Sequence, residues 1–247
     1  MRRTRLYRVV SVVIRQRDLG EADRILTLYT RERGKLSAVA KGIKRPRSKL
    51  AGSLQSFSHA VVQMAAGRSL DIVTQAQAID GHYRLREDMN RYAHASYVAE
   101  LLDALTDEGL SDMKTFELLL STLAALDRGE DSATMVRSFE LKLLRRLGYG
   151  PEIEACAVCG GDVGANTLFS VWQGGVVCRQ CAAGGGVEMS DAGLRALRNL
   201  WRMEMDDLSG RCLSEGVRSE VGRVMRAFVD SHLDRPLRSA AFLIDKG

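Results

Sequence analysis

Residues 156–181 read CAVCGGDVGANTLFSVWQGGVVCRQC, a run bounded by two C-x₂-C pairs, Cys156 with Cys159 and Cys178 with Cys181. Eighteen residues separate the two pairs, which is within the spacing typical of a four-thiolate zinc site. Two cysteines two residues apart can turn both sulfurs toward one point, and two such pairs complete a tetrahedron of sulfurs ~2.3 Å from the metal. Because four thiolates leave no open position for water or substrate, the sequence predicts a structural zinc ion, one per chain.

The segment between the pairs is typical of a hairpin. Leu168–Trp172 predicts a strand, Gly174-Gly175 a turn and Val176-Val177 the return strand. A ribbon of ~25–30 residues is too small to have much core of its own, so the metal replaces one. We predict a zinc ribbon inserted at residues 153–185 between helices.

Two other interpretations of these cysteines are open. Two disulfides would require an oxidising compartment, and nothing in the chain marks secretion. A thioredoxin-type redox site needs one C-x-x-C that opens a helix after a strand, and it needs no second pair. The pattern therefore favours zinc, and the fifth cysteine, Cys212, is interpreted as an ordinary thiol.

Residues 5–80 predict short strands separated by turns. The run Arg31–Gly34 is typical of a hairpin turn with glycine last. The five expected strands are Tyr7–Ile14, Arg24–Thr30, Lys35–Ala40, Phe57–Met64 and Leu70–Ala78. Five short strands with this spacing suit a small barrel, but the pattern alone does not separate an OB barrel from an SH3-like one.

After Gly81 the apolar period changes from 2 to 3.6 residues, which is typical of helices. Ser132 and Ser190 are expected to N-cap two of them. The other expected helices cover Arg91–Leu105, Thr115–Leu126 and Val217–His232. The sequence therefore predicts an α+β protein with a barrel domain at 1–80 and an all-α bundle at 81–247 that carries the zinc ribbon.

Charge is unevenly spread along the 247 residues. The whole chain has a net charge of +5, but residues 1–50 hold fifteen Lys/Arg against four Asp/Glu. A strongly basic end on an otherwise acidic chain indicates a polyanion partner for that end. No stretch approaches the length of a transmembrane helix or a signal-peptide core, so we expect a cytosolic protein without a membrane partner.

The loop Lys41–Lys49 concentrates this charge. Its five cations repel one another, and a phosphate backbone would relieve that repulsion. A solvated loop is the alternative, but further cations on neighbouring strands and turns favour a DNA-binding face. The candidate residues are Arg15, Arg17, Arg24, Arg31, Arg33, Lys35, Lys41, Lys44, Arg45, Arg47 and Lys49. Tyr7, Tyr29 and Phe57 could stack on unpaired bases, although each alone is better interpreted as a core residue.

Enzyme signatures are not found in the sequence. The four His are scattered, and none belongs to a zinc-hydrolase or deaminase motif. Gly34-Lys35 lacks the upstream Gly and the following Ser/Thr of a phosphate-binding loop. We find no active site and expect no enzymatic activity.

Several runs resemble the RecO family of bacterial recombination mediators. These runs are Gly20–Thr30, Gly34–Leu36, Ala40–Arg45, Leu147–Pro151 before Cys156–Gly160, and His232–Ser239. The resemblance covers essentially the whole chain. It implies an N-terminal OB fold, ligand status for Cys156, Cys159, Cys178 and Cys181, and a non-enzymatic role in DNA repair.

The resemblance also implies partners. RecO proteins bind single- and double-stranded DNA, anneal complementary strands and work with RecR. They contact the acidic tail of single-strand binding protein and indirectly help load RecA, in the bacterial cytoplasm at the nucleoid. The alternative is a zinc-ribbon RNA-binding or transcription-associated factor, which would share the basic barrel but should not accelerate annealing of coated strands.

Overall fold

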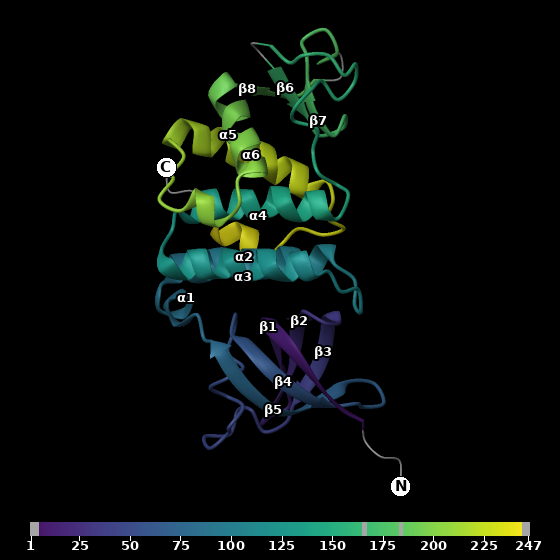
Figure 1. Cartoon of the computed structure of the whole chain (residues 1–247), viewed down its shortest axis with the longest axis vertical. Coiled ribbons are helices and arrows are strands. Elements are labelled where there is room, and N and C mark those ends of the chain that lie inside the picture. The colour runs from purple at the N-terminus through teal and green to yellow at the C-terminus, as the bar shows by residue number, and fades with distance from the viewer. Residues whose placement is uncertain (1–4, 165–166, 183–184, 244–247) are drawn as a thin grey trace. The chain divides into compact units, whose positions relative to one another are not determined.

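The structure is a computed structural model that describes residues 5–164, 167–182 and 185–243 (Figure 1). It forms two compact units, residues 1–127 and residues 128–247. Five strands come first, helices follow, and three further strands lie between helices of the second unit.

The first unit begins with a closed barrel whose strand order is β1-β2-β3-β5-β4. Its strands are β1 (Leu6–Leu19), β2 (Asp23–Thr30), β3 (Gly34–Ala40), β4 (His59–Ala65) and β5 (Asp71–Asp80). Neighbours pair antiparallel except β3 and β5, which are parallel through Ala38 and Asp71. This topology is OB-type, so the predicted barrel is confirmed and the SH3-like alternative is excluded.

Strand boundaries differ from the prediction in β1, β4 and β5, and β5 runs to Asp80 instead of Ala78. β1 runs on to Leu19 instead of ending at Ile14, because a register shift between Val13 and Arg15 lets it keep pairing with β2. β4 begins at His59 rather than Phe57, because Phe57 has a left-handed backbone with φ 68°.

The barrel core explains why the strands alternate. Inward-facing side chains of all five strands form one apolar cluster, joined by two residues of the loop after β3. Its buried members are Val9, Val13, Leu26, Leu28, Ala38, Ala40, Ile43, Leu54, Ala60, Val62, Met64 and Val73. Ile43 and Leu54 come from that loop, so the loop fills one end of the barrel.

Helices α1 (Tyr83–Glu87), α2 (Met89–Leu105) and α3 (Met113–Arg128) complete the first unit. Helix α2 packs on β1, where Val12 and Ile14 are buried outside the barrel interior. The compact unit therefore extends to residue 127, although the strands end at Asp80, close to the predicted domain boundary. The predicted domain boundary after residue 80 stays a prediction.

The second unit contains three helices that contact one another, α4 (Ser132–Arg146), α5 (Asp191–Arg202) and α6 (Glu215–Asp230). Ser190 caps α5 as predicted, but α4 is capped by Asp131 instead of Ser132, since its carboxylate accepts from the Thr134 amide at 2.9 Å. Two short 3-10 turns, Asp206–Leu208 and Ser239–Phe242, complete the helical part.

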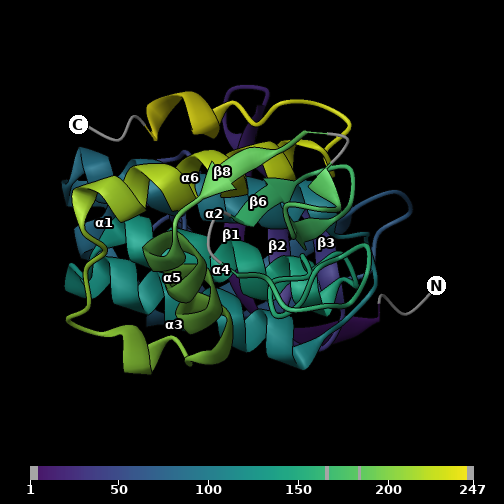
Figure 2. The ribbon, with the colours of Figure 1, turned by 90° about the horizontal axis from the view of Figure 1, so that it is seen from above.

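The ribbon between α4 and α5 is a small antiparallel sheet (Figure 2). Its strands are β6 (Thr167–Ser170), β7 (Gly175–Val177) and β8 (Val187–Met189). The predicted hairpin is β6–β7, and β8 adds a third strand on the other side of β6. Among the helices that the structure describes, none combines the length and apolar character needed to cross a bilayer.

Candidate metal centre and nucleic-acid interface

The two cysteine pairs form two tight turns of the ribbon. In the first, the Gly160 amide donates to the Cys156 carbonyl at 2.8 Å, and the Cys156 amide donates to the Gly161 carbonyl at 2.9 Å. Gly160 has φ +69°, a backbone that suits glycine. In the second, the Cys181 amide donates to the Cys178 carbonyl at 3.0 Å. Strand β7 leads directly into this second turn, so the hairpin brings the two pairs together.

The four sulfurs converge on one point. Those of Cys156, Cys159, Cys178 and Cys181 all lie within 4.8 Å of one another, and the Cys159 and Cys178 sulfurs are 4.0 Å apart. A tetrahedron of sulfurs ~2.3 Å from a metal has edges of ~3.8 Å. A disulfide needs ~2.05 Å between sulfurs, and all five cysteines are free thiols. The four side chains could therefore hold a metal ion and are not arranged as two disulfides.

Two of the four thiols have shifted pKa values. Hydrogen bonds from the backbone amides of Cys159 and Cys178 lower the pKa of Cys156 to about 6. Hydrogen bonds with the thiols of Cys178 and Cys159 raise the pKa of Cys181 to about 12. Four thiolates this close repel one another, so they cannot all ionise without a positive charge among them. A divalent metal supplies that charge and is bound by thiolates.

Helix α5 holds the start of the ribbon through two arginines. The Arg198 guanidinium donates to the carbonyls of Ile153 at 2.8 Å and Glu154 at 2.9 Å. The Arg202 guanidinium donates two hydrogen bonds to the Glu154 carboxylate, of 3.1 and 2.6 Å. The sequence analysis did not predict these contacts of Arg198 and Arg202. Their only sequence signal is the four-residue spacing of the two arginines, which places them on one face of α5.

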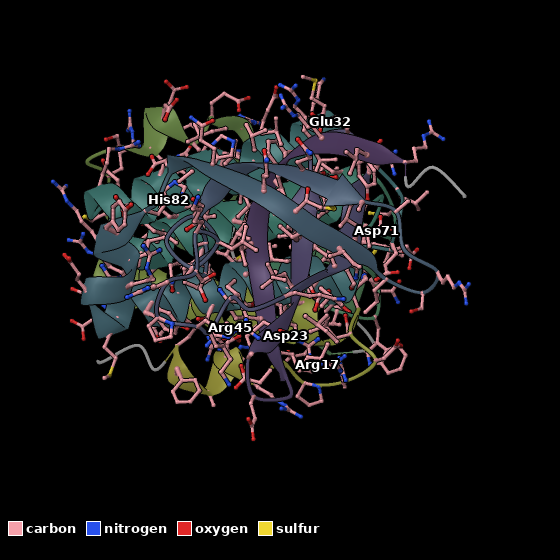
Figure 3. The ribbon with its side chains drawn as sticks, turned by 90° about the horizontal axis from the view of Figure 1, so that it is seen from below. Arg17, Asp23, Glu32, Arg45, Asp71 and His82 are labelled. Atoms are coloured by element: carbon pink, nitrogen blue, oxygen red, sulfur yellow. The ribbon has the colours of Figure 1, made fainter. Side chains whose placement is uncertain are left out.

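The basic loop 41–49 is anchored to the barrel. The Gly42 amide donates to the Asp23 carboxylate at 2.7 Å, and the Lys44 amide donates to the Ala22 carbonyl at 3.0 Å. Both acceptors lie at the turn between β1 and β2, and Ile43 is buried in the core. Figure 3 shows Arg17, Asp23 and Arg45 on one side of the barrel. The backbone of residues 42–44 is therefore fixed against the β1–β2 turn.

Most cations at this end of the barrel are exposed and uncompensated. Lys44 and Arg24 contact Asp18 at 2.9 and 3.0 Å, and their hydrogen bonds lower the pKa of that carboxyl group. The remaining cations have no ion-pair partner within the described residues. They are Arg17, Lys41, Arg45, Arg47 and Lys49. We call these five residues with Arg24 and Lys44 the loop cluster.

Four of the eleven predicted DNA-binding residues do not join the loop cluster. Arg15 and Lys35 both contact Asp103 of α2 at 3.2 Å, and the Lys35 side chain is only 12% exposed. Arg31 and Arg33 lie in the turn at the far end of β2. The residues predicted for a single face therefore lie in three places, because strand pairing separates them. Their contact with DNA stays a prediction.

The aromatic residues considered for base stacking are placed as core residues. Tyr29 and Phe57 are buried, at 1% and 3% exposure. Tyr7 is half-buried, and its ring is covered by the Arg33 guanidinium, 3.9 Å from the ring centre. None of the three offers an open ring face for a base.

The fold and these two sites define a class of protein. It has an OB-type barrel carrying an anchored basic loop, followed by helices carrying a four-cysteine ribbon. Sequence comparison agrees with this division: the family described as "Recombination protein O N terminal" matches residues 1–82, and "Recombination protein O C terminal" matches residues 86–241. The chain belongs to the RecO family, which gives it a role in DNA repair and recombination.

Its similarity to individual relatives extends over nearly the whole length. It is 38% identical to the DNA repair protein RecO of Pelotomaculum thermopropionicum, over 97% of this chain and 94% of that one. It is 39% identical to RecO of Roseiflexus sp., over 98% of this chain and 87% of that one. RecO of Rubrobacter xylanophilus is 40% identical, over 92% of each chain.

Proposed function

We propose that this protein is a DNA-binding recombination mediator that uses the loop cluster to hold the phosphate backbone. The carrying observation is the anchored loop 41–49, which presents exposed cations without carboxylate partners on an OB-type barrel. A fixed loop loses little conformational entropy when it binds, and Lys and Arg contacts to phosphate give affinity without sequence preference. Single- and double-stranded DNA share that backbone, so both are expected ligands.

We infer that Cys156, Cys159, Cys178 and Cys181 hold one structural zinc ion. Four convergent thiolates suit Zn²⁺ and leave no open coordination position. The ion would stabilise the short ribbon strands in place of an apolar core. The hydrogen bonds of Arg198 and Arg202 would fix the start of the ribbon to α5.

The finer roles rest on family membership. We propose strand annealing, partnership with RecR, contact with the acidic tail of single-strand binding protein, and indirect help in loading RecA, all in the bacterial cytoplasm. None of these steps requires a reacting side chain, so the proposal is non-enzymatic.

The test is a titration of labelled single-stranded DNA at several salt concentrations. The loop variant replaces Lys41, Arg45, Arg47 and Lys49 by Ala, and the matched control replaces Arg179, Arg195, Arg223 and Arg235, four exposed arginines of the second unit. Binding by the wild type should weaken on the order of a hundredfold or more between ~50 and ~200 mM salt. The loop variant should flatten the salt slope by ~2.8, because it loses four contacts at ~0.7 each on a single strand.

Two results would count against this function. A control variant that loses the slope while the loop variant keeps it would place the DNA on the second unit. Failure of the wild type to speed annealing of complementary strands coated with single-strand binding protein, together with tighter binding to RNA, would favour an RNA-binding factor.

A further inference from the structure

A second group of cations lies at the opposite end of the barrel from the loop cluster. It consists of five exposed arginines, which we call the arginine cluster: Arg5, Arg8, Arg31, Arg33 and Arg68. The Ala66 amide donates to the Arg5 carbonyl at 3.0 Å, which brings the start of β1 beside the β4–β5 turn that holds Arg68. The Arg31 amide donates to the Val10 carbonyl at 2.9 Å, which ties the β2–β3 turn to the same half of β1.

Arg33 is held in place before any ligand binds. Its guanidinium stacks 3.9 Å from the centre of the Tyr7 ring. The Tyr7 hydroxyl donates to Asp71, whose other oxygen accepts from the Gly67 amide at 2.9 Å. The stack is therefore fixed by both β1 and β5. A stacked guanidinium keeps N–H donors in its plane for a phosphate, and its fixed position lowers the entropy lost on binding.

The carboxylates near the arginine cluster are occupied. Glu32 accepts from the Val10 amide at 3.0 Å and pairs with Arg31 at 3.3 Å. Asp71 is engaged by Tyr7 and Gly67, as above. In the described part of the chain, Arg5, Arg8, Arg33 and Arg68 have no carboxylate partner. Five arginines against two engaged carboxylates leave a local excess of positive charge.

The middle of the barrel separates the two clusters. Strands β4 and β5 contain no Lys or Arg. Arg15 in the middle of β1 and Lys35, the only cation within β3, are both engaged by Asp103. Strand β2 has eight residues, and at ~3.3 Å per residue it spans ~25 Å between the clusters. Figure 3 shows Glu32, at the arginine cluster, on the opposite side of the barrel from Arg17 and Arg45. One strand crossing the barrel would meet neutral side chains such as Gln63, Gln75 and Gln77.

We propose that the barrel binds two nucleic-acid strands at once, one at the loop cluster and a second at the arginine cluster. The inference rests on the proposed DNA binding and names a second site for it. Two separate cationic sites on one rigid barrel bring two strands to the same molecule, which raises their effective concentration for each other. Annealing of complementary strands requires such an encounter.

The experiment uses the full chain with two non-complementary oligothymidines, one carrying a donor and one an acceptor dye. Each is ~12 nucleotides, the length of about one OB-fold site. Energy transfer is measured where sedimentation shows monomeric protein. The arginine variant replaces Arg8, Arg33 and Arg68 by Ala, and the loop-cluster variant replaces Lys41, Arg45 and Arg47 by Ala.

The wild type should bind two strands and give energy transfer, whereas each triple variant should bind one strand and lose the transfer. The annealing rate should fall at least ~tenfold in both variants, since each loses the second strand. Arg68→Glu alone should weaken the second site, and its position in an exposed turn leaves folding intact as judged by thermal melting.

Other outcomes separate this inference from the proposed function. The inference is overturned if the wild type binds one strand and the arginine variant binds and anneals equally well. The proposed DNA binding at the loop cluster would then be retained. A wild type that binds one strand whose affinity falls in both variants shows a single strand crossing both clusters, which also overturns the inference. A wild type that binds no DNA overturns the proposed function as well.

Discussion

At the scale of single residues, the four cysteines act as one unit. Cys178→Ser should weaken zinc affinity by more than ~100-fold, since even loss of partners beyond the metal ligands costs ~10–100-fold. Amides between residues 150 and 185 should then exchange faster with solvent, and those of the barrel should not. Elemental analysis and hydrogen exchange measure the two effects.

Cys212→Ser is the matched control, because Cys212 is an exposed thiol outside the cluster. It should leave the zinc content at one ion per chain. Purified wild type without zinc, with Cys156 in a disulfide, would contradict the site.

Tyr7 offers a prediction about pH. Burial and the hydrogen bond to Asp71 together raise the pKa of Tyr7 to about 12, against an opposing contribution from the Arg33 guanidinium. A folded pKa above the unfolded value near ~10 means that this contribution to stability is fully present below pH ~10. It is lost as the pH rises through about 12.

The two neighbours of Tyr7 should act with opposite signs. Asp71→Asn should lower the Tyr7 pKa, and Arg33→Ala should raise it, as followed by NMR of tyrosine labelled at Cζ. A Tyr7 pKa that moves the same way in both variants would contradict the stacked arrangement and, with it, the pre-positioning of Arg33.

At the scale of elements, the turn between β2 and β3 depends on Gly34. Its φ is +61°, and an added Cβ would lie 1.9 Å from the Leu110 carbonyl oxygen. The backbone approaches closely there, since the Gly109 amide donates to the Lys35 carbonyl at 2.9 Å. Gly20 has a similar φ of +63°, but no atom lies within 4 Å of its added Cβ.

Gly20→Ala should therefore cost only the backbone strain, ~1–2 kcal/mol. Gly34→Ala should cost clearly more, ~3 kcal/mol or above, because the chain after α2 must also move. Urea denaturation of both variants measures the difference. Equal losses would show that the contact with residue 110 does not constrain the turn.

The predicted elements agree with the structure where the pattern of apolar residues extends over enough positions to be recognised. Strand β1 follows from a continuous β-branched run and β2 from alternation of apolar residues, and the β6–β7 hairpin follows from Gly174-Gly175 between two short apolar runs. Strand β8 has three residues, too few for a pattern, and it exists because β6 offers a free edge. The extension of β1 required a bulge, whose register only the partner strand fixes.

At the scale of the whole molecule, the convergence of the four cysteines was predictable and the charge distribution was not. Each cysteine pair forms a local turn, so the sequence alone identifies the four residues that could hold a metal ion. Cations close in sequence were assigned to one face, yet Arg24 and Arg31, seven residues apart, lie at opposite ends of β2. The pairing of Lys35 with Asp103 joins residues far apart in the chain, and no local pattern predicts it.

The smallest stable N-terminal fragment should extend beyond residue 80. The sequence predicts a domain of residues 1–80, and the family match to residues 1–82 ends close by. Yet Val12, Ile14 and Phe57 are buried outside the barrel interior, and Phe57 packs edge-to-face on Tyr92 at 5.4 Å. Removing α2 exposes these three side chains at ~1.5–3 kcal/mol each, a loss of ~5 kcal/mol or more.

That loss is comparable to the whole stability of a small domain, ~5–15 kcal/mol. The fragment 1–127 should therefore unfold cooperatively, whereas 1–80 should be at least ~5 kcal/mol less stable or should not fold. Urea denaturation followed by circular dichroism compares the two. A fragment 1–80 that melts as cooperatively and at the same temperature as 1–127 would show that the barrel needs no helix. The unit that carries both cationic clusters would then be the barrel alone.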